Sequence, residues 1–197
     1  MTRSDLVGID RVGIVLAARW LGLTVSERVA GIDLFKQILE VCAREGFQPF
    51  LLGATPQVLE EAAKAISMQF AGLRDGYFSA SQEEEVVEEI LTSKADCLFI
   101  GMPTPRKERF LARYRDHLQV PFIMGVGGSL DIVAGYVNRA PKFLQAVSCE
   151  WLYRDYQEPR RMWWRYTRAN TLFARILMRA YIDRLLSRSV KPSIRPT

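Results

Sequence analysis

The sequence predicts an α/β fold: a Rossmann-like parallel sheet with helices on both of its faces. Three short apolar runs, Phe50–Gly53, Cys97–Gly101 and Phe122–Val126, have the length and flanking glycines of buried strands. Segments with helical spacing of apolar residues separate these runs, and this alternation is typical of a parallel sheet with helical crossovers. Ligands of such sheets bind at the carboxyl ends of the strands.

Helices are predicted on each side of the first strand. The apolar, alanine-containing segment Val12–Leu21 is expected to be helical, as is Leu34–Arg44, where apolar residues recur three and four positions apart. Thr55 followed by Pro56 is typical of an N-cap and a first helical residue. A helix is therefore expected from there to about Phe70.

The later helices are indicated by the same kinds of signal. Ser81 with Glu84 three residues further on predicts a capping box and a helix start. The segment Glu108–Leu118 is expected to be the next helix. The tail Pro159–Leu186 has apolar residues at helical spacing with arginines between them, which is a basic amphipathic pattern.

Length and charge bound the class of protein. The 197 residues suffice for one domain with a sizeable core. No apolar run reaches the roughly 20 residues that span a bilayer, and the first residues lack a signal-peptide pattern. Residues 151–197 contain 11 Lys and Arg against 3 Asp and Glu, a net charge of +8, whereas the whole chain carries +5. A negative partner surface is therefore expected: lipid headgroups, phosphates or nucleic acid.

Three parts are expected: an α/β domain over residues 1–150, a membrane-associating helical appendage over 151–188 and a disordered tail over 189–197. The appendage packs arginines among tryptophans and tyrosines. It could be a solvated helix face, but the arginine density and the Trp163–Trp164 pair count against that. Nucleic-acid binding calls for a recognisable fold, and none is apparent. Membrane-surface attachment fits the aromatics, the arginines and the helical period together.

Two loops follow predicted strands and could bind an anion. The glycines of Gly125–Ser129 would let the backbone approach a diphosphate, with N–H groups at the next helix start facing its charge. The alternative is a tight turn without a ligand. In Gly101–Glu108, Arg106 and Lys107 lie where a helix begins, and cations there oppose the helix dipole unless something negative offsets them. The alternative is a rigid surface loop.

Single residues offer weaker signals. Asp10 lies in a loop-like setting before an apolar helix, where a carboxylate could be a general base or simply an N-cap. Arg28 is by default a surface arginine. Cys42 and Cys97 are expected to be small buried residues. The one histidine, His117, has no partner at ligand spacing, so no zinc site is expected.

A series of short motifs extends over roughly Ser4–Tyr166. They are Asp10–Gly13, Glu27–Leu34, Leu51–Gly53, Gly76–Phe78, Gly101–Glu108, Gly125–Asp131, Gly135, Arg139–Pro141, Glu150–Arg154 and Glu158–Arg161. In this order they resemble the WecG/TagA/CpsF family of bacterial glycosyltransferases. The resemblance implies an inverting enzyme that moves a sugar, often N-acetylmannosamine or a related hexose, from a UDP donor to a polyprenyl-diphosphate-linked acceptor of surface polysaccharide.

The resemblance also implies the partners and the location. No cofactor or metal is obligatory, and the UDP-sugar is the donor substrate. The protein is expected in the cytoplasm, peripheral to the inner face of the cell membrane, with an anionic membrane surface as a partner. No nucleic-acid partner is expected. An exposed apolar stripe on the tail would be compatible with a homo-oligomer.

Site residues follow from the matching motifs. Asp10 falls on the aspartate proposed as general base, which takes the proton of the attacking acceptor hydroxyl. Donor binding is implied for Arg28, Pro105, Lys107, Glu108, Gly125, Gly127, Gly128 and Asp131. The glycine loop and nearby cations would hold the leaving UDP. Contact with the lipid diphosphate or membrane is implied for Arg154, Arg160, Arg161, Trp163, Trp164 and Arg165.

The sequence departs from the family pattern in three places. Arg11 stands where a glycine usually follows the aspartate, Pro103 replaces a glycine, and Lys107 replaces a glutamine. A lysine at position 107 can still stabilise phosphate, so this replacement concerns the choice of donor more than activity. The chain also begins some tens of residues into the pattern, without the first strands and a pocket threonine. The alternative function is therefore a truncated, non-catalytic, membrane-peripheral protein that binds nucleotide or partner subunits.

Overall fold

A computed structural model describes residues 29–142, 144, 153, 171–176, 178–179 and 181–182. The chain divides into two compact units. One is Val29–Arg139, and the other comprises Met1–Arg28 and Ala140–Thr197. The first unit contains nearly all described residues, and the fold below is that of this unit. The predicted boundaries at residues 150 and 188 remain predictions.

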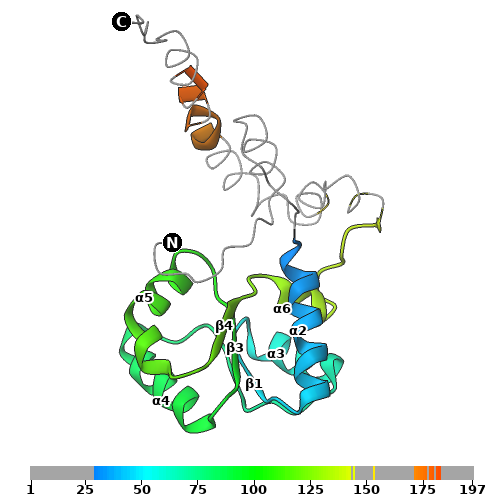
Figure 1. The fold of residues 1–197 in the computed structure, drawn as a ribbon, viewed down its shortest axis with the longest axis vertical. Coiled ribbons are helices and arrows are strands. Elements are labelled where there is room, and N and C mark those ends of the chain that lie inside the picture. The colour runs from blue at the N-terminus through cyan, green and yellow to red at the C-terminus, as the bar shows by residue number, and fades with distance from the viewer. Residues whose placement is uncertain are drawn as a thin grey trace, which may run out of the picture. The chain divides into compact units, whose positions relative to one another are not determined.

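A parallel four-stranded sheet forms the centre of the unit (Figure 1). Its strands are β1 (Pro49–Gly53), β2 (Gly72–Arg74), β3 (Cys97–Gly101) and β4 (Phe122–Gly125). They are ordered β2-β1-β3-β4, and every pairing is parallel. The predicted Rossmann-like α/β class is confirmed.

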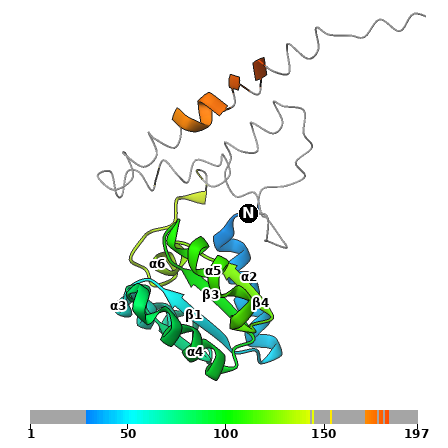
Figure 2. The ribbon, with the colours of Figure 1, turned by 90° about the vertical axis from the view of Figure 1, so that its left-hand side faces the viewer.

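Helices cover both faces of the sheet (Figure 1). They are α2 (Gly31–Glu45), α3 (Pro56–Ile66), α4 (Glu83–Ser93), α5 (Arg106–Leu118) and α6 (Ser129–Val133), with a 3₁₀ turn at Ala80–Gln82. Figure 2 shows the unit from the side of α4 and α5. Helices α4 and α5 contribute to one hydrophobic core, and α2, α3 and α6 to the other. The predicted two-sided arrangement is therefore present.

The two cores follow from the alternation of side chains along a strand. Phe50 and Leu52 of β1 belong to the core under α4 and α5, whereas Leu51 belongs to the core under α2 and α3. All three side chains are fully buried. Each such burial stabilises the fold by roughly 1.5–3 kcal/mol, so a strand that is apolar at every position is what a sheet covered on both sides requires.

The two cysteines predicted to be buried lie in the second core and contact each other. Cys42 of α2 and Cys97 of β3 have their Sγ atoms 3.7 Å apart, and both are free thiols. Burial and the hydrogen bond with Cys42 raise the pKa of the Cys97 thiol to about 12. Both residues therefore act as small apolar side chains, as expected.

The predicted helix after the first strand is shorter than expected. Thr55 does cap it, since its side-chain oxygen accepts from Val58 N, and Pro56 is its first residue. The helix ends at Ile66, however, because Ser67 takes a left-handed conformation with φ of 53°. The residues beyond it lead into β2, which the sequence analysis missed because a three-residue strand carries almost no periodic signal.

Two further expectations were wrong in detail. The capping box is formed by Ser79 and Gln82, and α4 begins only at Glu83 after a 3₁₀ turn, so the predicted box of Ser81 and Glu84 is displaced by two residues. The strand β4 pairs only with β3 among the described strands and is not fully buried. Phe122, at its start, is 36% exposed.

Only a few tail residues are described. Residues 171–176, 178–179 and 181–182 are helical, which agrees with the predicted amphipathic helix at those positions. Leu172, Ile176 and Ile182 are exposed. Within the described residues, none of the helices combines the length and apolarity needed to cross a membrane.

Candidate functional site at the carboxyl edge of the sheet

Glycines mark the carboxyl edge of the sheet. β1, β3 and β4 each end in a glycine, and Gly76 follows β2 by two residues. A Cβ on Gly53 would lie 2.6 Å from the backbone carbon of Gly101, and a Cβ on Gly76 would lie 3.0 Å from the Cα of Gly53. The backbones at the ends of β1 and β3 and in the loop after β2 therefore pack directly against one another, which only residues without a Cβ allow.

Lys107 lies over the end of β4. A Cβ on Gly125 would meet Lys107 Nζ at 2.8 Å and its Cδ and Cε at 3.0 Å. The side chain of Lys107 is 21% exposed and has Glu108 Oε1 at 3.5 Å from its ammonium. Two residues predicted from separate motifs are thus brought together, with a cation held at the edge where parallel sheets bind ligands.

The turn that follows Gly125 offers further backbone donors. Val126 N donates to Ile100 O at 2.9 Å and Ser129 N donates to Val126 O at 3.1 Å, so these two groups are satisfied. Gly127 has φ of +53° and Gly128 is the N-cap of α6. In the part of the chain that the structure describes, neither glycine N–H has an acceptor. Two open donors and an ammonium are the groups that an anionic oxygen requires.

Glu108 of α5 contacts both Lys107 and the loop that follows β3. Its carboxylate accepts from Thr104 Oγ1 at 3.0 Å and lies in the first turn of α5, where the helix dipole favours an anion. Burial raises the pKa of Glu108. Its own backbone N–H, the Thr104 hydroxyl and the Lys107 ammonium outweigh this and lower the pKa below its usual value. The carboxylate therefore positions Lys107 and the loop, which is a supporting role.

Arg106 ties the loop after β3 to the loop after β2. Its guanidinium donates to Gly76 O at 2.7 Å and to Phe78 O, and it stacks over the Phe78 ring at 4.4 Å from the centroid. The two carbonyls lie on either side of Tyr77, whose side chain is 75% exposed. Cations at a helix start were expected to need a negative partner, and for Arg106 that partner is this pair of backbone carbonyls.

The structure says less about the other residues that were predicted to bind the sugar donor. Pro105 is the N-cap of α5. Asp131 is half-buried in α6, and its carbonyl accepts from Tyr136 N and Val137 N in the turn that follows. Asp10 and Arg28 lie outside the described residues, as do the lipid- or membrane-contacting residues Arg154, Arg160, Arg161, Trp163, Trp164 and Arg165.

Sequence reasoning missed three contributors to this unit. Arg106 was noted only as a helix-start cation, and Asp33 and Arg139 only as members of motifs. Asp33 Oδ2 of α2 accepts from Arg139 Nη2 at 2.6 Å. A long-range pair of this kind leaves no local signal, and only the recurrence of both residues within family-like motifs could have suggested it.

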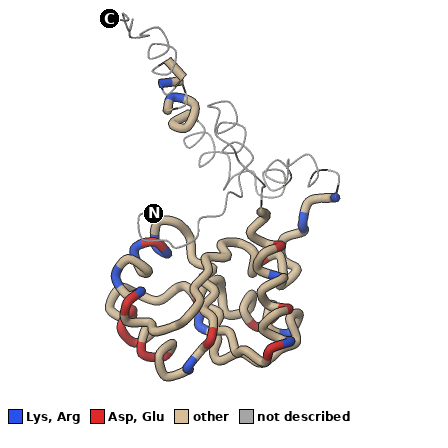
Figure 3. The backbone as a smooth tube through the Cα atoms, viewed as in Figure 1, with Lys and Arg blue, Asp and Glu red and all other residues tan. Residues whose placement is uncertain are grey.

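Other charged or hollow regions of the unit are weaker candidates for a ligand site than this edge. Figure 3 shows acidic residues gathered along α4, where Arg74 pairs with Glu85 at 3.3 Å and with Glu89 at 3.2 Å. A shallow hollow of about 290 Å³ lies at the opposite edge of the sheet, lined by residues such as Asp96 and Pro121 that precede β3 and β4. Among the described residues, no group of three or more His, Cys, Asp or Glu could hold a metal ion.

Comparison with known proteins decides the family. The model of the glycosyl transferase WecG/TagA/CpsF family matches residues 1–186. The chain belongs to this family. The WecG/TagA/CpsF resemblance inferred from the motifs is therefore confirmed, and the carboxyl edge described above contains several of those motifs.

One curated relative is informative. The chain is 31% identical over 170 residues to an N-acetylglucosaminyldiphosphoundecaprenol N-acetyl-beta-D-mannosaminyltransferase of Bacillus spizizenii (strain ATCC 23059 / NRRL B-14472 / W23). The match covers 84% of the chain and 65% of the relative, so the chain spans slightly less than two thirds of that protein's length.

Proposed function

We propose that this WecG/TagA/CpsF protein is a glycosyltransferase that moves N-acetylmannosamine or a related hexose from a UDP donor to a polyprenyl-diphosphate-linked acceptor. Family membership and the name of the Bacillus spizizenii relative support the reaction class and the lipid-linked acceptor. One observation carries the donor assignment: the Lys107 ammonium lies over Gly125, and Gly127 and Gly128, whose N–H groups have no acceptor among the described residues, follow Gly125 in the same loop.

In this proposal the carboxyl edge binds the donor diphosphate. At Gly127 the space that a Cβ would enter is open, so phosphate oxygens could approach the backbone of the loop there. Lys107 and the two N–H groups would then offset the charge that develops on the leaving UDP as the bond to the anomeric carbon breaks. Stabilisation of that charge lowers the barrier because it is stronger in the transition state than in the bound substrate.

Asp10 supplies the chemistry on the acceptor side. Its carboxylate would take the proton from the acceptor hydroxyl as that oxygen attacks the anomeric carbon from the face opposite UDP, which inverts the configuration. No metal takes part in this proposal, because Lys107 and the N–H groups act on the leaving phosphate. The proposal places the protein at the inner face of the cell membrane, held there by the basic, aromatic appendage.

Thermal unfolding with and without UDP tests the donor site. UDP at 100 times its dissociation constant should stabilise the protein by about 2.7 kcal/mol. Replacing Lys107 by Ala should weaken UDP binding by about tenfold, since one phosphate contact of roughly 1.4 kcal/mol is lost. Arg109→Ala, an exposed change of the same charge on α5, should leave the affinity unchanged. Equal affinities in both variants would remove Lys107 from the site.

The transfer step is tested by Asp10→Asn. Turnover of a UDP-sugar onto a polyprenyl-diphosphate acceptor should be lost while UDP binding stays, because the amide cannot accept the proton. Turnover that survives the change would exclude Asp10 as the base. UDP binding by the unaltered protein without any transfer would favour the non-catalytic binding function.

The membrane role needs a separate measurement. Deleting Pro159–Thr197 should release the protein from anionic liposomes, because this segment contains most of the basic and aromatic residues of the appendage. The exposed Leu172 and Ile176 support an apolar contribution to that binding. Undiminished liposome binding by the shortened protein would contradict the membrane role.

A further inference from the structure

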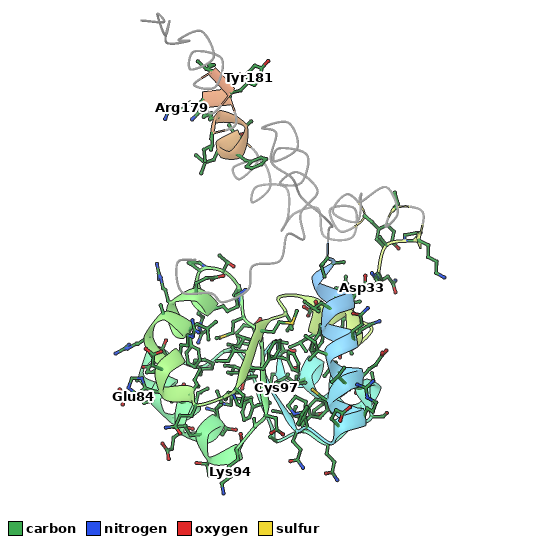
Figure 4. The ribbon with its side chains drawn as sticks, viewed as in Figure 1. Asp33, Glu84, Lys94, Cys97, Arg179 and Tyr181 are labelled. Atoms are coloured by element: carbon green, nitrogen blue, oxygen red, sulfur yellow. The ribbon has the colours of Figure 1, made fainter. Side chains whose placement is uncertain are left out.

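The chain passes between its two units at two places. One passage lies between Arg28 and Val29 and the other between Arg139 and Ala140. Within the Val29–Arg139 unit, Asp33 lies in the first turn of α2, a few residues after the first passage, and Arg139 is the last residue before the second. Figure 4 shows Asp33 at the end of α2 where the unit begins.

An ion pair joins these two points. Arg139 Nη2 donates to Asp33 Oδ2 at 2.6 Å, across 106 residues of sequence. The two side chains are 46% exposed for Asp33 and 26% for Arg139. This is a short, charge-assisted hydrogen bond at the surface, and such bonds specify geometry more than they stabilise a fold.

Apolar packing also joins the start of α2 to α6. Ile32 of α2 and Leu130 of α6 are buried in the same core, which holds the two helices together independently. The turn after α6 is closed by its own backbone bonds, Gly135 N to Ile132 O at 3.2 Å and Tyr136 N to Asp131 O at 3.0 Å. What the pair adds is a second attachment point at the end of this segment, where the chain leaves the unit.

We infer that the Asp33–Arg139 pair is a clip that joins the two ends of the Val29–Arg139 unit, and that both residues are positioning residues for sugar transfer. The inference rests on the proposed function, in which Asp10 precedes the first connecting segment and the appendage arginines follow the second. The proposed donor site consists of Lys107 and the N–H groups of Gly127 and Gly128, and none of these groups takes part in the clip. Opening the clip should therefore lower turnover and leave UDP binding unchanged.

A proteolysis readout tests the clip without requiring enzyme activity. Lys142 is exposed and lies three residues after Arg139, so a lysine-specific endoproteinase reports on this segment through cleavage after Lys142. In Asp33→Asn and in Arg139→Gln, cleavage there should be roughly 3- to 10-fold faster, since local opening is no longer opposed by the charged hydrogen bond. Glu40→Gln, an exposed change on the same helix, is the matched control.

Kinetics and rescue separate positioning from a merely structural role. Each single variant should lower kcat about tenfold and leave the UDP dissociation constant and the urea midpoint unchanged. The double variant that exchanges the two residues, Asp33→Arg with Arg139→Asp, should restore slow cleavage and part of the kcat. Unchanged cleavage in both single variants would overturn the clip. A parallel loss of UDP binding and stability would also overturn it, by showing a structural role. If the unaltered protein shows no transfer, the proposed function fails while the cleavage result still decides the clip.

Discussion

Arg106 provides the sharpest test of how the carboxyl edge is built. Its guanidinium donates two hydrogen bonds, to Gly76 O and to Phe78 O, and covers the Phe78 ring. These contacts join the loops after β2 and β3, which are 28 to 30 residues apart in sequence. Replacing Arg106 by Ala should therefore destabilise the fold itself, before any effect on ligand binding.

The magnitude follows from the three contacts. Hydrogen bonds to a charged donor contribute about 1.5–3 kcal/mol each, and a cation over an aromatic ring adds about 0.5–2 kcal/mol. Arg106 is only partly buried, so water can replace some of these contacts in the variant. We expect a net loss of about 2–4 kcal/mol in the free energy of unfolding for Arg106→Ala. Arg106→Lys should lose about half of that, because an ammonium lacks the planar fork that reaches both carbonyls.

Urea unfolding followed by circular dichroism measures this effect. With a slope of about 2 kcal/mol per molar urea, Arg106→Ala should lower the midpoint by about 1–2 M. Arg109→Ala, which removes the same charge from an exposed position of α5, should move it by less than about 0.3 M. If the two alanine variants unfold at the same midpoint, the assigned contacts of Arg106 do not hold the two loops together.

Three further predictions concern the core and the loop. Gly53→Ala should destabilise the protein by about 3 kcal/mol or more, because its Cβ would lie 2.6 Å from the β3 backbone. Gly46 also has a positive φ but has open space around it, so Gly46→Ala should lower the free energy of unfolding by only about 1 kcal/mol in urea. Equal losses in the two variants would contradict the close approach. The lowered pKa of Glu108 means that its stabilising effect is present above its unfolded pKa and is lost as pH falls through the folded value. The difference in urea midpoint between the unaltered protein and Glu108→Gln should thus be larger at pH 7 than near pH 3, and a difference independent of pH would refute the assigned charge. Cys97, with its thiol pKa of about 12, and the buried Cys42 should resist iodoacetamide at pH 8 until urea unfolds the protein, and mass spectrometry showing rapid modification of the native protein would contradict their burial.

The order of strands and helices could be predicted where the local signal is strong. The apolar run Cys97–Gly101 is β3 with unchanged bounds, and Thr55 with Pro56 does begin α3. Both signals are local: a strand covered on two faces must be apolar throughout, and a cap needs only its own side chain and the first turn. The short β2 lacks such a signal, because its pairing with β1 rather than its composition makes it a strand.

Some features of the candidate site could likewise be predicted from the sequence, and others could not. The glycine loop and the cation-bearing loop could each be recognised as anion-binding candidates from residue type and order, and the family from the series of motifs. The meeting of Lys107 with Gly125 could not, since it depends on β3 and β4 being neighbours in the sheet. The same holds for Arg106, whose acceptors are carbonyls that every residue possesses and that only the fold brings within reach.

The α/β class, the family and the basic character of the tail could thus be predicted from the sequence alone. These properties depend on hydrophobic period, caps, charge and motif order, which are written in neighbouring residues. Only the folded chain shows which loops meet at the carboxyl edge, that Lys107 lies over Gly125 there, and that Asp33 and Arg139 join the two ends of the unit. Those contacts arise from strand order and close backbone packing, and their energies exist only once distant segments lie side by side.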